Sequence, residues 1–383
     1  MSVYLDYNAS APIDERVLEV MIDIYKNSIG NADSRTHNFG ENARKIVENA
    51  REQVASLLDI DKGEVFFTSG STESNNIAIQ GLKEYALETG KTHIITTTIE
   101  HKSILETAKY LQQNGFVVDF IPPESSGRIN EQAVFDKIGE NTLLVSVMHA
   151  NNETGIIQPV KEIGDFLADK DILFHIDATQ TCGKLVPNIK KLKYNMLSFS
   201  AHKLSGPQGI GALILRKKRY KLPPVKKIMF GGQQERGIRP GTTPVALVAG
   251  FGKACQLAEK EYNDNIENCR SIKKGILALL NASKLEYEVN GEPNFCMPNT
   301  LNLSIKGVES EALMLSTKDF CGISNGSACT SRDYKPSYVL SSMKLDNDRI
   351  SQAVRLSWGG KSVKEEIMND FSLLIKMAEE LVF

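Results

Sequence analysis

Lys203 lies between an apolar, strand-like run and a glycine-rich turn, in the stretch SFSAHKLSGPQGIG. Most lysines are solvated surface charges, but Lys203 follows a strand and precedes glycines that let the backbone turn close to a ligand. A lysine that is desolvated in a crevice has a lowered pKa and readily forms Schiff bases. Lys203 is therefore a candidate covalent catalyst, and a surface charge is the alternative.

Two other predicted strands also end in polar residues. The stretch FFTSGSTESNN ends a strand and starts a helix, so the N–H groups and hydroxyls of residues 69–72 converge on one point. Such a helix start suits a phosphate group, although Ser and Thr there also serve as plain helix caps. The stretch FHIDATQT ends its strand with Asp177, followed shortly by Gln180. An acid at this position caps a helix, binds a metal or pairs with a protonated ring nitrogen.

These polar strand ends make a set when they are taken together, because ligands of a parallel sheet bind outside the carboxyl ends of its strands. A phosphate cup at Thr72, the acid Asp177 and Lys203 are what pyridoxal phosphate (PLP) needs: the acid keeps the ring an electron sink and the lysine holds the aldehyde carbon. The stretch VMHANNETG adds Asn152 and further polar groups, some of which are ordinary turn hydrogen-bonders. The chain order of cup, acid and lysine resembles that of aspartate-aminotransferase-like PLP enzymes.

Cys329, in SNGSACTS, is a second reactive centre. Its neighbours are small and polar, whereas structural cysteines favour apolar surroundings. An unperturbed thiol with a pKa of about 8.5 is only slightly ionised at neutral pH, so Cys329 needs a cation or an acid–base partner near by. No CxxC pair occurs, so neither a zinc site nor a disulfide framework is predicted. The remaining cysteines lie in helical or strand-like runs and are expected to be buried: Cys182, Cys255, Cys269, Cys296 and Cys321.

The elements that must position these residues alternate between helix and strand. Residues 41–58 carry apolar side chains at i, i+3, i+4 and i+7 spacing, which is typical of an amphipathic helix. Helices are also predicted over 73–88, 102–113 and 160–168. Between and after them stand short apolar runs with the length of buried strands: EVFFTSG, THIITTTIEH, FVVDFIP, TLLVSVMHANNE, ILFHIDATQ, MLSFSAHK and GALILR. This order predicts an α/β fold with a largely parallel sheet covered by helices.

The pattern changes after a long helix that begins at about Val245. The C-terminal part mixes strands with helices over 310–318 and 364–381, which predicts a smaller α+β domain. A chain of 383 residues is longer than a single core usually grows, so two domains are expected. The formal charge of −2 provides no bulk attraction to nucleic acid or membranes. Without a secretory signal or a long apolar run, the protein is expected to be cytoplasmic.

The motifs together resemble the cysteine desulfurases of the class V aminotransferase family, the NifS and IscS types. The resemblance implies a PLP-dependent transferase fold with a large domain over 16–259 that holds a mostly parallel seven-stranded sheet. The small domain would comprise 1–15 and 260–383 and carry the Cys329 loop. The motifs span nearly the whole chain: YLDYNASAP, GNADSRTH, SGSTESNN, EHKS, HANNETG, HIDATQTCGK, SFSAHKLSGPQGIGAL, GGQQERGIRPGT, GSACTS and RLSWGG.

The resemblance also implies a role for each candidate site residue. Lys203 would bind PLP covalently, Asp177 would pair with the pyridine nitrogen, and His101 would lie over the ring. Arg355 would clamp the substrate carboxylate, because a guanidinium binds a carboxylate with two hydrogen bonds. The other expected ligands are Asn152 and Gln180 at the phenolic oxygen and substrate, Asn31 in the same pocket, Thr72, Ser200 and His202 at the phosphate, and Thr242 at the phosphate of the neighbouring subunit of a homodimer.

The implied reaction converts L-cysteine to L-alanine. Cys329 takes the sulfur as a persulfide, His101 and Lys203 carry protons, and the sulfur passes to an iron–sulfur scaffold, a tRNA-thiolation protein or a DNA-sulfur-modification protein. Direct nucleic-acid binding is not expected. The alternatives are an ordinary aminotransferase or β-eliminating lyase, in which Cys329 has no covalent role, and a non-catalytic binding protein on the same fold.

Two features depart from the family pattern. Ala32, Trp358 and Gly360 stand where other residues are usual, which indicates a variant acceptor or partner surface. The chain also ends at KMAEELVF, without the tail that helps the IscS type to dock its scaffold. This ending argues against delivery to that particular scaffold.

Overall fold

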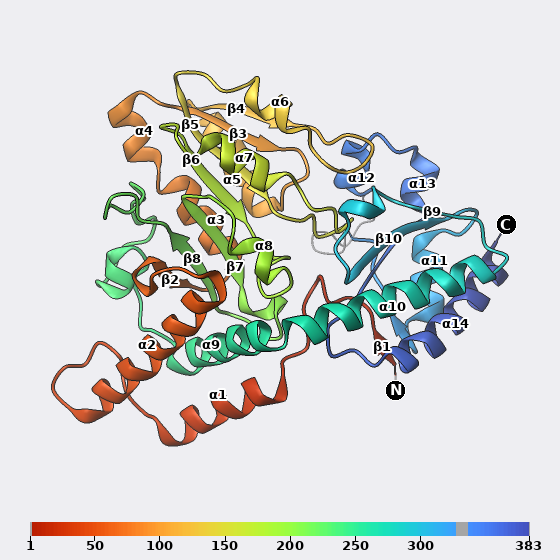
Figure 1. Cartoon of the computed structure of the whole chain (residues 1–383), viewed down its shortest axis with the longest axis horizontal. Coiled ribbons are helices and arrows are strands. Elements are labelled where there is room, and N and C mark those ends of the chain that lie inside the picture. The colour runs from red at the N-terminus through yellow and green to blue at the C-terminus, as the bar shows by residue number, and fades with distance from the viewer. Residues whose placement is uncertain (1, 327–335, 383) are drawn as a thin grey trace.

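A computed structural model of the chain describes residues 2–326 and 336–382. Cys329 therefore lies outside the described residues. Figure 1 shows a larger unit built on a wide sheet and a smaller unit beside it, and both termini lie in the smaller unit. Helices α9 (Val245–Lys260) and α10 (Tyr262–Ala282) follow one another along the base of both units.

The sheet of the larger unit has seven strands in the order β2-β8-β7-β6-β5-β3-β4. All neighbours are parallel except β8, which runs antiparallel to β2 and β7. The predicted α/β fold with a mostly parallel seven-stranded sheet is thus confirmed. Its strands are β2 (Val65–Thr68), β3 (His93–Thr97), β4 (Val117–Ile121), β5 (Thr142–Met148), β6 (Leu173–Asp177), β7 (Met196–Ser200) and β8 (Gly211–Leu215).

Apolar side chains cover both faces of this sheet, as expected for parallel strands. Phe67 and Val145 join one core cluster, whereas their neighbours Phe66 and Leu144 point to the opposite face and join another. The first face is covered by α1 (Glu15–Asn27), α2 (Asn38–Leu58), α7 (Val160–Leu167), α8 (Val186–Ile189) and α9, and the second by α3 (Ser71–Gln80), α4 (Lys83–Thr89) and α5 (Lys102–Gln113).

One predicted helix is wrong, because residues 73–88 belong to two helices rather than one. Helix α3 ends at Gln80 and α4 begins at Lys83. Gly81 lies between these helices, and its carbonyl oxygen accepts a hydrogen bond from the N–H of Lys226. A Cβ added to Gly81 would lie 2.6 Å from the Lys226 carbonyl oxygen. A distant segment thus packs against the backbone here and interrupts the helix.

The smaller unit contains an antiparallel sheet in the order β12-β10-β9 and the parallel pair β1-β11. Its core draws on Leu5 and on residues between Cys269 and Ala378. The predicted boundaries of the two domains remain a prediction.

The remaining elements of the whole chain are β1 (Val3–Tyr4), β9 (Tyr287–Val289), β10 (Thr300–Ile305), β11 (Cys321–Gly322), β12 (Ala353–Ser357), α6 (Glu131–Phe135), α11 (Ser310–Thr317), α12 (Tyr338–Ser342), α13 (Asn347–Ser351), α14 (Lys364–Leu381) and the 3₁₀ turns η1 (Lys62–Glu64), η2 (Ala201–Lys203), η3 (Gln234–Gly237) and η4 (Pro293–Phe295).

Trp358 does not form a partner surface, contrary to the expectation from sequence. Its side chain is fully buried in the core of the smaller unit, and its Nε1–H donates to the Cys269 carbonyl oxygen at 3.1 Å. Ala32 is buried as well. These two departures from the family pattern are therefore changes of packing.

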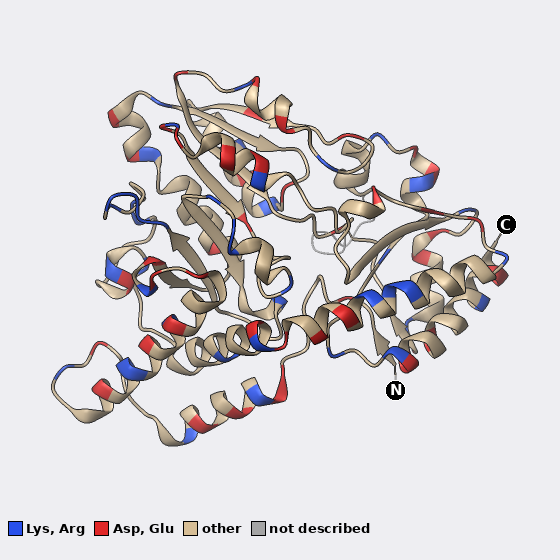
Figure 2. Cartoon of the chain, in the orientation of Figure 1, with Lys and Arg blue, Asp and Glu red and all other residues tan. Residues whose placement is uncertain are grey.

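Charged residues of both signs are interspersed along the outer helices in Figure 2, in keeping with the net charge of −2. None of the helices in the described ranges combines the length and the apolar character needed to cross a bilayer.

Candidate active site

A cavity of about 750 Å³ opens at the carboxyl ends of β5, β6 and β7. Residues of the smaller unit close its other side. Most of the predicted site residues line this cavity: Thr72, His101, Asn152, Asp177, Gln180, His202, Lys203 and Arg355. Asn31 and Thr242 are exposed and do not line it, and Cys329 is outside the described residues.

Lys203 is half-buried, and its side chain is directed at the N-terminal segment. It follows β7 at the end of η2, and its Nζ donates to the carbonyl oxygens of Asn8 at 2.5 Å and Ala9 at 2.6 Å. In the SGPQG turn that follows, Gly206 packs against the backbone of Ala201. A Cβ added to Gly206 would lie 2.9 Å from the Ala201 carbonyl oxygen. The chain therefore turns back tightly after Lys203. Because Lys203 is half-buried and lines the cavity, it is not a surface charge.

The predicted phosphate cup is the N-terminus of α3. Gly70 precedes the helix with φ +152°, which favours glycine, and no side chain caps the helix there. The N–H of Ser71 donates to the Ser200 Oγ at 2.6 Å, so the end of β7 holds the helix start in place. Thr72 is exposed toward the cavity. An uncapped helix start with adjacent hydroxyls attracts an anion.

His202 lines the same cavity as this helix start. Its Nδ1 lies 3.2 Å from the Ser10 Oγ. Burial, together with the nearby charges of Lys203 and Lys184, lowers the pKa of His202 to about 4. His202 is therefore a neutral imidazole that can donate a hydrogen bond, and Lys203 supplies the positive charge beside it in the lining of the cavity.

Asp177 stands at the end of β6 and is almost completely buried. Its Oδ2 accepts from the Asn75 Nδ2 at 2.8 Å, and its Oδ1 accepts from the N–H and the hydroxyl of Thr179 at 3.0 and 2.5 Å. These donors fix the orientation of the carboxylate at the floor of the cavity. His101, the N-cap of α5, lies on the cavity wall, and burial lowers its pKa below 6.5.

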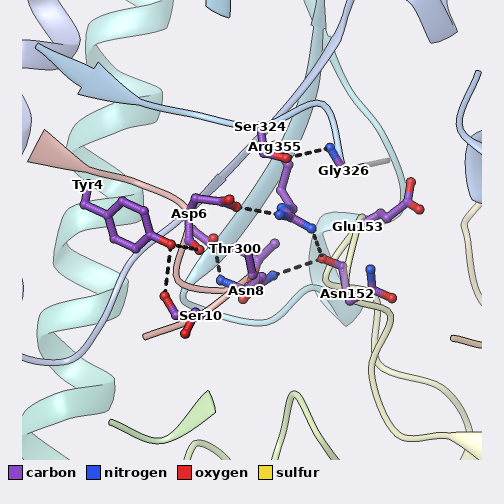
Figure 3. Close-up of polar contacts among 12 residues, drawn as sticks. Tyr4, Asp6, Asn8, Ser10, Asn152, Glu153, Thr300, Ser324, Gly326 and Arg355 are labelled. Carbon is purple, nitrogen blue, oxygen red and sulfur yellow. Dashed lines mark hydrogen bonds and ion pairs between the residues drawn. The ribbon is translucent and has the colours of Figure 1, made fainter. Parts of the chain in front are cut away.

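Arg355 reaches the cavity from β12 and is 3% exposed. Figure 3 shows its guanidinium between the N-terminal segment and the loop after β5. One terminal nitrogen donates to the Asp6 Oδ1 at 2.5 Å and the other to the Asn152 carbonyl oxygen at 3.0 Å. The amide of Asn8 supports the same loop, donating to the Asn152 carbonyl oxygen at 3.3 Å and to the Thr300 Oγ1 at 2.9 Å.

Residues 6–9 are therefore part of the site, because they contact both Lys203 and Arg355. The sequence interpretation missed them. The signal available was the motif YLDYNASAP, which contains Asp6 and Asn8 and which the resemblance included without a role.

The comparisons with known proteins agree with this geometry. The model of the family described as "Aminotransferase class-V" matches residues 3–369. The chain belongs to the class V aminotransferase family. It is 41% identical to a cysteine desulfurase IscS of Serratia proteamaculans (strain 568) over 98% of this chain and 92% of that protein. Two solved structures resemble it: a NifS-like protein (TM-score 0.91, 34% identity, all of both chains) and SspA in complex with cysteine (TM-score 0.81, 33% identity, 95% of this chain and 100% of the other).

The cavity of this class V aminotransferase fits PLP, the general cofactor of its family. The uncapped α3 start and His202 suit the phosphate, and the buried Asp177 carboxylate suits a ring nitrogen that carries a proton. In addition, the Oδ1 of Asn152 is buried without a hydrogen-bond partner among the described residues. A buried polar atom of this kind is expected to pair with a bound molecule.

Glu153 contacts described residues on both sides of the segment 327–335. It is buried, and its carboxylate accepts from the Ser337 Oγ at 2.5 Å. A Cβ added to Gly326 would lie 3.1 Å from the Glu153 Oε2. Burial raises the pKa of Glu153. Gly326 and Pro336, the described residues next to 327–335 in the sequence, both line the cavity.

The other cysteines are mostly buried, as predicted: Cys182, Cys255, Cys269 and Cys321. Burial raises the pKa of Cys269 and of Cys321 to about 12, which keeps these thiols protonated. Cys296 departs from the prediction, because it is only partly buried and lies in a loop after η4, with its Sγ 3.4 Å from the Thr300 carbonyl oxygen.

Glu100, next to His101, is fully buried. Its Oε1 accepts from the Met148 N–H at 3.0 Å and the Thr97 hydroxyl at 2.7 Å, whereas Oε2 has no partner among the described residues. Burial raises the pKa of Glu100 to about 8. The side chain is thus neutral in the folded protein at neutral pH.

This buried acid predicts how stability depends on pH. The unfolded chain loses the Glu100 proton near its ordinary pKa of 4.5, but the folded chain keeps it up to about pH 8, so the free energy of unfolding falls between these values. Glu100→Gln keeps the shape of the neutral acid. We expect its free energy of unfolding near pH 8 to exceed that of the parent by a few kcal/mol, on the order of 1.4 kcal/mol per unit of pKa shift.

Urea unfolding of the parent and of Glu100→Gln, near pH 5 and near pH 8, measures how the free energy of unfolding of each depends on pH. Glu19→Gln, on the exposed side of α1, is the control and should leave the pH dependence of the parent unchanged. If the Glu100→Gln variant loses as much stability between the two pH values as the parent does, the folded protein does not hold Glu100 neutral.

Proposed function

We propose that this class V enzyme is a cysteine desulfurase, which converts L-cysteine to L-alanine and stores the sulfur as a persulfide on Cys329. One observation carries the proposal: Lys203, Asp177 and Arg355 line one cavity, and Gly326 and Pro336 line it as well. These last two are the described residues on either side of the segment that contains Cys329. Relatives named cysteine desulfurase and the likeness to an SspA that binds cysteine support it.

The cofactor in this proposal is PLP, which when bound supplies an electron sink beside the substrate Cα. Lys203 would bind it covalently, and Asp177 would pair with its ring nitrogen. His101 would lie over the ring. The remaining contacts would come from Gln180 and Asn152 at the phenolic oxygen and from Thr72, Ser200 and His202 at the phosphate.

Arg355 binds the α-carboxylate of the substrate. Asp6 and Asn152 each occupy one N–H of its terminal nitrogens, and a guanidinium carries more N–H donors than these two oxygens use. The ion pair with Asp6 therefore holds the guanidinium in place and leaves other N–H donors of Arg355 for the substrate. A charged, prearranged clamp of this kind favours amino acids with a free carboxylate.

Lys203 and His101 then move protons at the substrate Cα and at the carbon that becomes the alanine methyl group. The thiolate of Cys329 attacks the substrate sulfur. An S–S bond forms, the substrate C–S bond breaks, and its electrons remain with the carbon, which takes up a proton. Alanine leaves, and the outer sulfur of the persulfide is available to a second thiol.

Product analysis tests the proposal. Purified chain loaded with PLP is incubated with L-cysteine, and alanine, pyruvate and enzyme-bound sulfur are measured. The proposal predicts alanine and persulfide in equal amounts in the first turnover. Pyruvate with free sulfide would identify a β-eliminating lyase, and a requirement for a 2-oxo acid would identify an aminotransferase. A chain that gains no yellow colour with PLP would be a non-catalytic binding protein.

The clamp gives a prediction for substrate binding. Arg355→Lys keeps the charge but loses the paired hydrogen bonds, which are worth about 1.5–3 kcal/mol when one partner is charged. We therefore expect KM for L-cysteine to rise by about 10–100-fold, with a smaller effect on kcat, in steady-state assays of alanine formation. Arg349→Lys, whose guanidinium bonds Asn290 outside the cavity, is the matched control. An unchanged KM in Arg355→Lys would remove the residue from the substrate site.

A homodimer belongs to the proposal, because Thr242 and Asn31 are exposed in a single chain and do not line its cavity. The predicted role of Thr242, at the phosphate of the neighbouring subunit, requires a second subunit, whereas Asn31 was predicted to line the same pocket. Large apolar side chains are exposed elsewhere on the same unit, which supports an interface: Tyr25, Ile29, Phe39 and Phe230. Sedimentation equilibrium of the purified chain should give twice the mass of one chain.

The sulfur acceptor in this proposal is a cytoplasmic protein of iron–sulfur assembly, tRNA thiolation or DNA sulfur modification. Persulfide sulfur that is labelled on the enzyme should move to one of these classes when purified candidates are added. Transfer to none of them would show that the acceptor belongs to a different class.

A further inference from the structure

Polar side chains form a continuous hydrogen-bonded chain from Asp177 to His101. The Asn75 Nδ2 donates to the Asp177 Oδ2 at 2.8 Å and to the Ser103 Oγ at 2.9 Å. The Ser103 Oγ lies 2.8 Å from the His101 Nδ1. The chain links β6, α3 and α5, and three of its members, Asn75, Ser103 and Asp177, are less than a tenth exposed.

The direction of each hydrogen bond follows from the chemistry of the groups. The Asp177 carboxylate only accepts, so the amide nitrogen of Asn75 and not its oxygen must face it. The second hydrogen of that nitrogen then goes to the Ser103 Oγ, which accepts it. Ser103 has its own hydroxyl hydrogen left, and the group within reach is the His101 Nδ1.

A second donor reaches the same nitrogen. The backbone N–H of Ser103 donates to the His101 Nδ1 at 3.2 Å, because His101 is the N-cap of α5. With two donors directed at it, Nδ1 is the unprotonated nitrogen of the neutral ring. The ring proton therefore sits on Nε2.

We propose that Asn75 and Ser103 are positioning residues that hold His101 in the neutral tautomer with its proton on Nε2, so that this nitrogen of the resting enzyme offers a hydrogen-bond donor and not a lone pair. The inference deepens the proposed function, on which the catalytic role of His101 rests. In that reaction Nε2 already carries a proton and has no lone pair with which to take another, which assigns the first removal of the Cα proton to Lys203 and not to His101.

The charges around His101 agree with a neutral ring. Burial lowers its pKa, and of the charged groups that face it, Lys203 of η2 and Lys102 of α5 lower it further, whereas Asp177 of β6 raises it. A hydrogen bond donated to the unprotonated Nδ1 also favours the neutral form. Removing the Ser103 hydroxyl must consequently raise the pKa of His101 toward its ordinary value of 6.5.

Nitrogen NMR of the chain labelled with ¹⁵N-histidine tests the inference without cofactor or turnover, because the two ring nitrogens give different shifts in the two tautomers. His101→Gln identifies the signals of His101 by their loss. We expect the proton on Nε2 in the parent, and in Ser103→Ala a higher pKa of His101 and a smaller share of this tautomer. Ser103→Thr, which retains the hydroxyl, should restore the pattern of the parent.

A proton on Nδ1 of His101 in the parent would overturn the inference, and so would a Ser103→Ala variant that folds with an unchanged titration of His101. The first result does not depend on Ser103→Ala, so a failure of that variant to fold leaves the test standing. The NMR result is also independent of the proposed function. A chain that makes no alanine from L-cysteine but holds the proton on Nε2 contradicts the desulfurase assignment alone.

Discussion

Lys203→Ala lowers kcat for alanine formation by on the order of 10²–10⁴-fold, the usual cost of removing a positioned acid–base group. Lys203 lines the cavity, and the carbonyl oxygens of Asn8 and Ala9 hold its Nζ. In the proposed reaction, its loss removes both the covalent attachment of PLP and the group that takes the Cα proton. Measurement of alanine at saturating L-cysteine, with the absorbance of bound PLP recorded in parallel, gives both effects.

Two variants make this result specific. Lys203→Arg keeps the positive charge but cannot form a Schiff base, so it should be as inactive as the alanine variant. Lys191→Ala, an exposed lysine that does not line the cavity, should match the parent. Activity of Lys203→Arg within a few-fold of the parent would mean that Lys203 acts only through its charge.

Cys329→Ala abolishes sulfur transfer and lowers alanine formation by about 10³-fold or more, as expected when a covalent nucleophile is removed. The four buried cysteines cannot replace it, because their thiols are enclosed in the core. The variant should still bind PLP with the absorbance of the parent. Loss of turnover with an intact cofactor separates this effect from that of Lys203→Ala.

Cys296→Ala is the control for Cys329→Ala, because Cys296 is the one cysteine of the described residues that is only partly buried. Its removal should leave alanine formation unchanged. Sulfide and pyruvate production that continues at the parent rate in Cys329→Ala would favour the lyase alternative.

The sheet and its helices were predictable because their signals are local. Each of the seven apolar runs became a strand of the large sheet, and helices α5 and α14 have the predicted bounds, Lys102–Gln113 and Lys364–Leu381. The break between α3 and α4 was not predictable, because it depends on the contact of Gly81 with Lys226. Such a contact is set by tertiary packing and leaves no trace in periodicity.

The candidate site was predictable to the extent that it lies at strand ends. Asp177 ends a strand, and Thr72 and Lys203 come shortly after strands of the same sheet, so the topology brings the three together. The contribution of Asp6 was not predictable, since it meets Arg355 across 349 positions of sequence. Asn75 had a local signal, because it lies four residues after Ser71 on α3 and so shares its face.

The fate of the substrate sulfur in a single turnover shows whether Cys329 takes the sulfur from L-cysteine. L-cysteine labelled at sulfur is mixed with an excess of PLP-loaded enzyme, the alanine formed is measured, and the protein is digested without reductant. One labelled sulfur is expected for each alanine, carried by the peptide that contains Cys329 and released by a thiol. Alanine formed without label on that peptide, or formed equally by Cys329→Ala, would contradict this role of Cys329.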